Sequence, residues 1–207
     1  MNELEKMLSG ALYLPEDPEL KALRAKAHRL SMEYNNTPET DPERRETILS
    51  ELVPNRGDGV YLQGPVQFDY GVFTSFGAGS YANFNLTVLD CAPVNIGNCV
   101  YMGPNVSLYT ALHPMHPDDR RFFPFAHGTT DQESAKPITI GDDCWLGGNV
   151  TVCSGVTIGR GCVIGAGSVV TRDIPDGVFA AGVPCRVIRK ITEADRLSDS
   201  RMNERSD

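Results

Sequence analysis

The sequence contains no long apolar run. Its first residues, Met1 to Lys6, are charged and polar and do not read as a secretory leader. No window approaches the roughly 18 apolar residues that a membrane-spanning helix requires. We therefore expect a cytoplasmic protein with no membrane partner.

The sequence also lacks an excess of basic residues. It holds 19 Lys and Arg against 27 Asp and Glu, for a net charge of -8. Binding to nucleic-acid phosphates relies on a basic stripe, and none is visible, so we expect no nucleic-acid partner. The overall charge does not exclude a local basic pocket for an anionic cofactor.

Paired cysteine motifs are missing. There is no Cys-x-x-Cys, and we interpret the scattered thiols as small core side chains in a reducing compartment rather than as metal ligands or disulfides. The chain also has no glycine-rich loop of the nucleotide-binding types. The six cysteines are Cys91, Cys99, Cys144, Cys153, Cys162 and Cys185.

Helix signals occupy the first 56 residues. Asp17-Pro18-Glu19 and Asp41-Pro42-Glu43 each combine an N-cap with proline at the first helical position. Apolar residues follow each cap at helical spacing, and Asn35-Asn36-Thr37-Pro38 separates the two runs. We predict a helical N-terminal segment over 1–56.

A six-residue repeat replaces the helical spacing after residue 57. A small or β-branched residue stands four positions after each aliphatic one. The repeat continues upstream with a two-residue shift, and the segment 109–137 interrupts it. The aliphatic positions are Ile140, Leu146, Val152, Ile158, Ile164 and Val170.

This period predicts a triangular coil. Each hexapeptide supplies a short strand and a turn, and three of them form a rung of about 18 residues that stacks on the next at about 4.8 Å. We therefore predict a mainly β protein, a parallel β-helix over 57–190, followed by a charged tail over 191–207. The spacing defines neither the hand of the coil nor the number of subunits.

Several motifs, in order, resemble the maltose and galactoside O-acetyltransferases over nearly the whole chain. They include Glu33-Tyr34-Asn35, Phe68-Asp69-Tyr70-Gly71, Tyr81-Ala82-Asn83-Phe84-Asn85, His113-Pro114, Cys144-Trp145-Leu146-Gly147-Gly148 and Ala181-Gly182-Val183-Pro184-Cys185-Arg186. The resemblance implies a left-handed β-helix, an exception to the usual right-handed crossover. It also implies a homotrimer with active sites between subunits, acetyl-CoA as cosubstrate, a sugar acceptor and no required metal.

Direct acetyl transfer needs a base for the acceptor hydroxyl but no protein nucleophile, provided that hydroxyl and thioester are bound together. Imidazole can take that proton near neutral pH. His113, where the repeat breaks, matches the base of the family, and His116 is the alternative. We expect His28 to be a surface or packing residue of a helix.

Further roles follow from the resemblance. Asn83 would contact the reacting hydroxyl, although Asn also suits a β-helix corner. The backbone N–H of Gly148 would face the thioester oxygen. Asp69 and Arg24 would bind the acceptor, or form surface ion pairs.

The resemblance also implies a set of cofactor contacts. Arginines suit the phosphates of CoA. The single tryptophan would flank the pantetheine arm, form a contact in the trimer, or both. The set is Trp145, Gly148, Ala166, Thr171, Arg172, Arg186 and Arg189.

The sequence departs from the family pattern between residues 118 and 134. Phe122, Phe123 and Phe125 lie there, and we expect them to pack on a neighbouring subunit or to form an apolar acceptor wall. The identity of the sugar therefore stays open. Three alternatives remain: an acetyltransferase of another acceptor such as an antibiotic, a zinc-dependent hydrase with three histidine ligands, and a non-catalytic assembly module.

Overall fold

The computed structural model describes residues 1–197, so the predicted tail 191–207 lies outside the described residues from position 198 onward. The chain begins with three helices, α1 (Glu3–Ser9), α2 (Pro18–Asn36) and α3 (Pro42–Leu52). The side chains of Asp17 and Asp41 accept N–H groups of the first turns of α2 and α3, as predicted. No helix among the described residues is long and apolar enough to cross a membrane.

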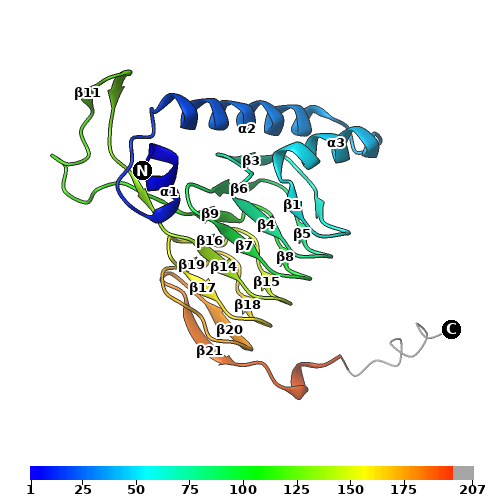
Figure 1. Ribbon diagram of the computed structural model, residues 1–207. Helices are drawn as coiled ribbons and strands as arrows, with labels where there is room; N and C mark the ends of the chain where they lie inside the picture. Colours follow the sequence, from blue (N-terminus) through cyan, green and yellow to red (C-terminus); the bar gives the residue numbers. More distant parts are fainter. Residues whose placement is uncertain (198–207) are drawn as a thin grey trace.

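The rest of the chain forms a stacked coil of short strands (Figure 1). Its first strands are β1 (Asn55–Arg56), β2 (Tyr61–Leu62), β3 (Val66–Phe68), β4 (Thr74–Phe76), β5 (Tyr81–Ala82), β6 (Leu86–Leu89), β7 (Val94–Ile96), β8 (Tyr101–Met102) and β9 (Ser107–Tyr109). After the interruption follow β14 (Ile138–Ile140), β15 (Trp145–Leu146), β16 (Thr151–Val152), β17 (Thr157–Ile158), β18 (Val163–Ile164), β19 (Val169–Val170), β20 (Val178–Ala181), β21 (Arg186–Lys190) and a short 3₁₀ helix (Glu193–Asp195).

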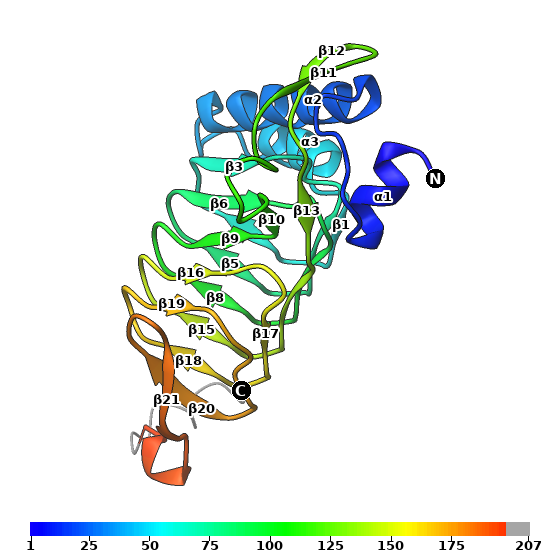
Figure 2. The ribbon, with the colours of Figure 1, turned by 90° about the vertical axis from the view of Figure 1, so that its left-hand side faces the viewer.

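These strands make three sheets, the faces of a left-handed parallel β-helix. The sheet orders are β1-β4-β7-β14-β17, β2-β5-β8-β15-β18-β20-β21 and β3-β6-β9-β16-β19. Each rung supplies one strand to each sheet, as the stacked strands in Figure 2 show. The final pair, β20 with β21, is antiparallel. The predicted fold class is confirmed.

The repeat positions form the core of the coil. All six aliphatic residues from Ile140 to Val170 are at most 1% exposed, and the small positions between them are buried as well. All six cysteines are unpaired, and Cys91, Cys144, Cys162 and Cys185 are buried. Burial of this apolar column, at about 25 cal/mol per Å² removed from water, is the main stabilising term for the stack.

The helical segment closes the first rung. Arg45, on α3, is buried and donates to the carbonyl oxygens of Leu62 and Gln63 at 2.9 and 3.0 Å. Its guanidinium also lies 4.3 Å from the centre of the Tyr34 ring on α2. The cap therefore supplies donors to carbonyls that have no rung above them.

The interruption between β9 and β14 is itself structured. It contains two antiparallel pairs, β10 (Ala111–Leu112) with β13 (Ser134–Ala135) and β11 (Phe123–Phe125) with β12 (Gly128–Thr130). The β11–β12 hairpin projects beyond the coil, beside the start of α2 (Figure 2). Phe122 is 69% exposed at the foot of the hairpin, whereas Phe123 and Phe125 are half-buried.

Candidate active site

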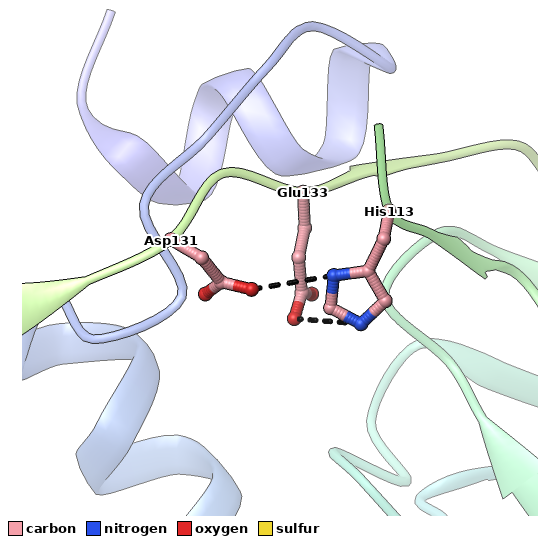
Figure 3. A group of neighbouring side chains, drawn as sticks. All are labelled: His113, Asp131 and Glu133. Carbon is pink, nitrogen blue, oxygen red and sulfur yellow. Dashed lines mark ion pairs between the residues drawn. The ribbon is translucent and has the colours of Figure 1, made fainter. Parts of the chain in front are cut away.

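His113 follows directly after β10, and the antiparallel register sets it opposite the residues that precede β13. Nδ1 of its imidazole lies 3.3 Å from Oδ2 of Asp131, and Nε2 lies 3.9 Å from Oε1 of Glu133. Figure 3 shows both carboxylates facing the ring, Asp131 toward Nδ1 and Glu133 toward Nε2. The imidazole is half-exposed, while both carboxylates are largely buried. The structure therefore gives the candidate base two anionic neighbours.

A third buried group completes this cluster. The hydroxyl of Tyr13, from the segment between α1 and α2, donates to Oε2 of Glu133 at 2.6 Å. Burial raises the pKa of the Glu133 carboxyl, although the bond from Tyr13 and the nearby imidazole oppose the rise. Sequence reasoning did not find Tyr13, Asp131 or Glu133. The sequence feature that could have indicated them is the pair Asp131 and Glu133, two carboxylates separated by one residue near the end of the interruption.

The predicted acceptor residues lie on the same side of the coil. Arg24 donates to the carbonyl oxygen of Pro15 at 3.1 Å and to the hydroxyl of Tyr70 at 3.4 Å. Oδ1 of Asp69 lies 3.5 Å from Nε2 of His28. His28, expected to be a surface or packing residue, is exposed. It also lies beside Asp69, a residue predicted to bind the acceptor.

The chain leaves the strands of the third sheet, β3-β6-β9-β16-β19, along one edge of the prism. We call this edge the His113 edge. Asp69 follows β3, the segment carrying His113 follows β9, and Thr171 and Arg172 follow β19. Thr171 and Arg172 are exposed. The candidate base, Asp69 and two predicted cofactor contacts therefore share this edge, while Arg24 lies on α2.

Asn83, Gly148 and Ala166 form a column on another edge, which we call the Asn83 edge. They lie just after β5, β15 and β18, where the chain turns from the second sheet into the third. Oδ1 of Asn83 accepts the N–H of Phe84 at 2.7 Å, and the left-handed residue of this corner is Asn85 (φ 62) rather than Asn83. Among residues 1–197 the N–H of Gly148 donates to no protein group, so it is free to meet a ligand.

Within one chain, the two edges stand at opposite ends of the third sheet. Asn105 and Thr110 bracket its strand β9, and the five steps from one to the other, at about 3.3 Å each, span at most about 16 Å. Direct transfer requires base, hydroxyl and carbonyl to be in contact. In one chain, a strand of the third sheet therefore lies between the corner of Asn83 and Gly148 and the start of the segment that carries His113.

An aromatic column covers the outer face of the second sheet. Pairing aligns Tyr61, Tyr81, Tyr101, Trp145, Val163 and Phe179 on successive rungs. Tyr101 and Trp145 are 53% and 56% exposed. The corresponding outward positions of the other two sheets are mainly Ser, Thr, Asn and Gln. We call the outward stripe of the second sheet, from Tyr61 to Phe179, the aromatic column.

The two predicted cofactor arginines of β21 differ in their contacts. Arg189 shares a groove of about 410 Å³ with Trp145 and Phe179, and it makes a two-pronged ion pair with Asp195 at 2.7 and 2.8 Å. Arg186 donates to the carbonyl oxygen of Cys185, its own neighbour. Arg189 is therefore already paired with a carboxylate that would compete with a phosphate, while Arg186 has no such anionic competitor among residues 1–197.

The three-histidine arrangement that a zinc hydrase requires is not formed among the described residues. His113 clusters with carboxylates, His127 packs on the Phe125 ring at 5.6 Å, and His116 lies beside Asp118. The histidines of one chain therefore do not form that site, and the group of described residues that could hold a metal ion is His113 with Asp131 and Glu133.

The fold and this cluster place the chain in the class of hexapeptide-repeat acyltransferases. Residues 6–57 match the family model of the maltose acetyltransferase hexapeptide capping motif, and residues 137–172 match that of the hexapeptide repeat of succinyl-transferase. The first match covers the helical cap and the second covers rungs of the coil.

Full-length relatives agree with both matches. The galactoside O-acetyltransferase of Escherichia coli is 40% identical, over 93% of this chain and 91% of its own length. A solved maltose O-acetyltransferase from Clostridium difficile superposes with a TM-score of 0.86 at 41% identity, covering 93% of this chain and 99% of its own. A galactoside acetyltransferase in complex with coenzyme A gives 0.86 at 40% identity, with 94% of each chain covered. The chain belongs to the galactoside and maltose O-acetyltransferase family, and it is an acyltransferase.

Proposed function

We propose that this protein transfers the acetyl group of acetyl-CoA to a hydroxyl of a sugar, with His113 as the general base. The observation that carries the proposal is the imidazole of His113 facing the carboxylates of Asp131 and Glu133, on the edge that also holds Asp69. The names of the relatives support the sugar acceptor, and those bound to coenzyme A support the donor.

The two carboxylates act on different nitrogens of the imidazole. Asp131, at 3.3 Å, favours a proton on Nδ1, which leaves the lone pair of Nε2 free to accept the proton of the acceptor hydroxyl. Glu133, at 3.9 Å from Nε2, then faces the nitrogen that gains this proton. Its negative charge stabilises the imidazolium until the proton passes to the departing thiolate. Acetyl-CoA supplies the activated acyl group as a thioester.

The charge that develops on the carbonyl oxygen requires a donor. Because the Gly148 N–H is free, it can donate there, with the side-chain amide of Asn83 beside the reacting hydroxyl. Both groups lie on the Asn83 edge, so a complete site requires the His113 edge of one subunit and the Asn83 edge of another. We therefore propose a homotrimer with three active sites between subunits.

The aromatic column supports this assembly. Monomeric proteins rarely expose a continuous apolar stripe of this length, and closed homo-oligomers commonly bury such a stripe. Trp145 would lie at the margin of that contact and beside the pantetheine arm. Ala166, Thr171, Arg172 and Arg186 would complete the cofactor cleft, with Arg189 joining once Asp195 is displaced. A cytoplasmic location stays a prediction.

Thiol release from acetyl-CoA tests the proposal, measured over a panel of glucosides, galactosides and their aryl glycosides. We expect turnover of at least one sugar, and a loss of about 100-fold or more in His113→Ala, because removal of a general base costs this much. The matched control is His116→Ala, the exposed neighbour in the same segment, which should keep most of the activity. Undiminished turnover in His113→Ala would contradict the assignment of the base.

A further inference from the structure

We propose that Tyr13 is a positioning residue of the reaction, which holds Glu133 in place against the imidazole of His113. This inference rests on the proposed function. It gives the N-terminal segment, described above as a cap, a second role inside the active site.

Three hydrogen bonds join the two residues across 120 positions of sequence. The N–H of Tyr13 donates to the carbonyl oxygen of Glu133 at 2.9 Å, and the N–H of Glu133 returns a bond to the carbonyl oxygen of Tyr13 at 3.1 Å. The phenol then donates to Oε2 of the Glu133 side chain at 2.6 Å. Main chain and side chain of Glu133 are therefore both held by Tyr13.

The phenol also determines which carboxylate oxygen is available to the base. Oε2 is occupied by the bond from Tyr13, which leaves Oε1 facing Nε2 of His113. Tyr13 is 1% exposed, and burial raises the pKa of its phenol far above the ordinary range. The phenol consequently stays protonated near neutral pH and acts there as a donor.

The remaining neighbours define the electrostatics of this unit. Asp131, Arg24 and His113 influence Glu133, and the Cys91 thiol lies against Tyr13. Burial raises the pKa of the Cys91 thiol, which therefore adds no charge near neutral pH. Among these neighbours the phenol is the direct hydrogen-bond donor to the Glu133 side chain.

The test is Tyr13→Phe, which removes the hydroxyl and keeps the buried ring. We expect kcat to fall by about tenfold or more, because the base is less well oriented, while KM for acceptor and acetyl-CoA stays within about twofold. With its donor lost, Glu133 is protonated more readily and supports the imidazolium less. The midpoint of the acidic limb of kcat/KM against pH should therefore move to lower pH.

Tyr34→Phe is the matched control. It also deletes a buried phenol bond, from Tyr34 to the carbonyl oxygen of Leu62 at 2.6 Å, but in the cap over the first rung. A merely structural role would make the two variants alike: less stable, with a wild-type pH profile and a wild-type kcat per folded molecule. That result would overturn the proposal.

The double variant Tyr13→Phe/Glu133→Gln adds a second criterion. If Tyr13 acts through Glu133, its loss costs little further kcat once Glu133 is replaced, whereas fully multiplicative losses would contradict the proposal. Failure of the wild type to acetylate any sugar would refute the proposed function instead. The positioning claim would then be decided by the NMR signals of the His113 imidazole, which should change in Tyr13→Phe and not in Tyr34→Phe.

Discussion

At the residue scale, Glu133 combines a cost in stability with the proposed role beside His113. Burial raises its pKa above the ordinary value of 4.5, so the fold favours the protonated carboxyl. Ionisation of Glu133 therefore lowers the free energy of unfolding. This loss of stability develops as pH rises from the pKa of Glu133 in the unfolded chain through its raised pKa in the folded protein. The ionised form is the one that stabilises an imidazolium.

Glu133→Gln should therefore separate stability from activity. The amide oxygen can still accept the bond from Tyr13, but the side chain carries no charge at any pH. We expect the variant to be more stable than the wild type at pH 8, with the difference shrinking toward pH 4, while kcat falls. Urea unfolding over this range and kcat measured on the same preparations check both effects. A variant that is less stable at pH 8, or that keeps the wild-type kcat, would contradict this account.

Sequence reasoning found His113 and the residues of its edge, but not the groups that orient it. His113 and Asp69 stand in motifs that carry the family resemblance, and Arg24 matches a position at which the resemblance implies acceptor binding. Tyr13 and Glu133 meet only because the antiparallel bridge between their segments forms in the folded chain. No local pattern in either segment encodes that contact.

At the element scale, the coil was predictable and the interruption was not. The six-residue spacing defines both the strands and their inward faces, because every rung obeys the same geometry. The hairpin of β11 and β12 follows no repeat, and its pairing depends on Phe123, Phe125 and the turn before Gly128. The helices of the cap were visible from their Asp-Pro-Glu motifs, but the bonds from Arg45 to the first rung were not.

Arg45→Met should destabilise the cap. The change leaves the buried Gln63 and Leu62 carbonyls with fewer donors and removes the stacking on Tyr34, so we expect a loss of about 2–4 kcal/mol. Arg44→Met is the neighbouring control: Arg44 is exposed and pairs with Glu33 at the surface, and its loss should cost less than about 1 kcal/mol. Urea unfolding at one fixed protein concentration compares the two. Equal losses would contradict the role of Arg45 as a cap.

At the scale of the whole molecule, the proposed trimer predicts that each active site combines the His113 edge of one subunit with the Asn83 edge of another. Asn83→Ala removes the functional side chain of the Asn83 edge, and His113→Ala removes that of the His113 edge. Neither variant alone should be active. Co-expressed in equal amounts, they assemble at random, and about three quarters of trimers are mixed, each with one complete site, so about a quarter of wild-type activity should return.

The control is a mixture of the two variants after each has been purified as a trimer. Subunits of assembled trimers do not exchange on simple mixing. The mixture should stay inactive until the trimers are dissociated and reassembled. No recovery after co-expression would contradict shared sites and would require His113 and Asn83 to act within one chain.

The measurement that tests the central claim most directly follows the acetyl group itself. Acetyl-CoA labelled with ¹³C at the acetyl carbonyl is incubated with the protein and the best acceptor of the panel, and the products are observed by NMR. The account predicts that the label appears as an ester on a sugar hydroxyl, at a rate equal to thiol release and abolished by His113→Ala. Label that stays on CoA, or that appears only as free acetate, would contradict it.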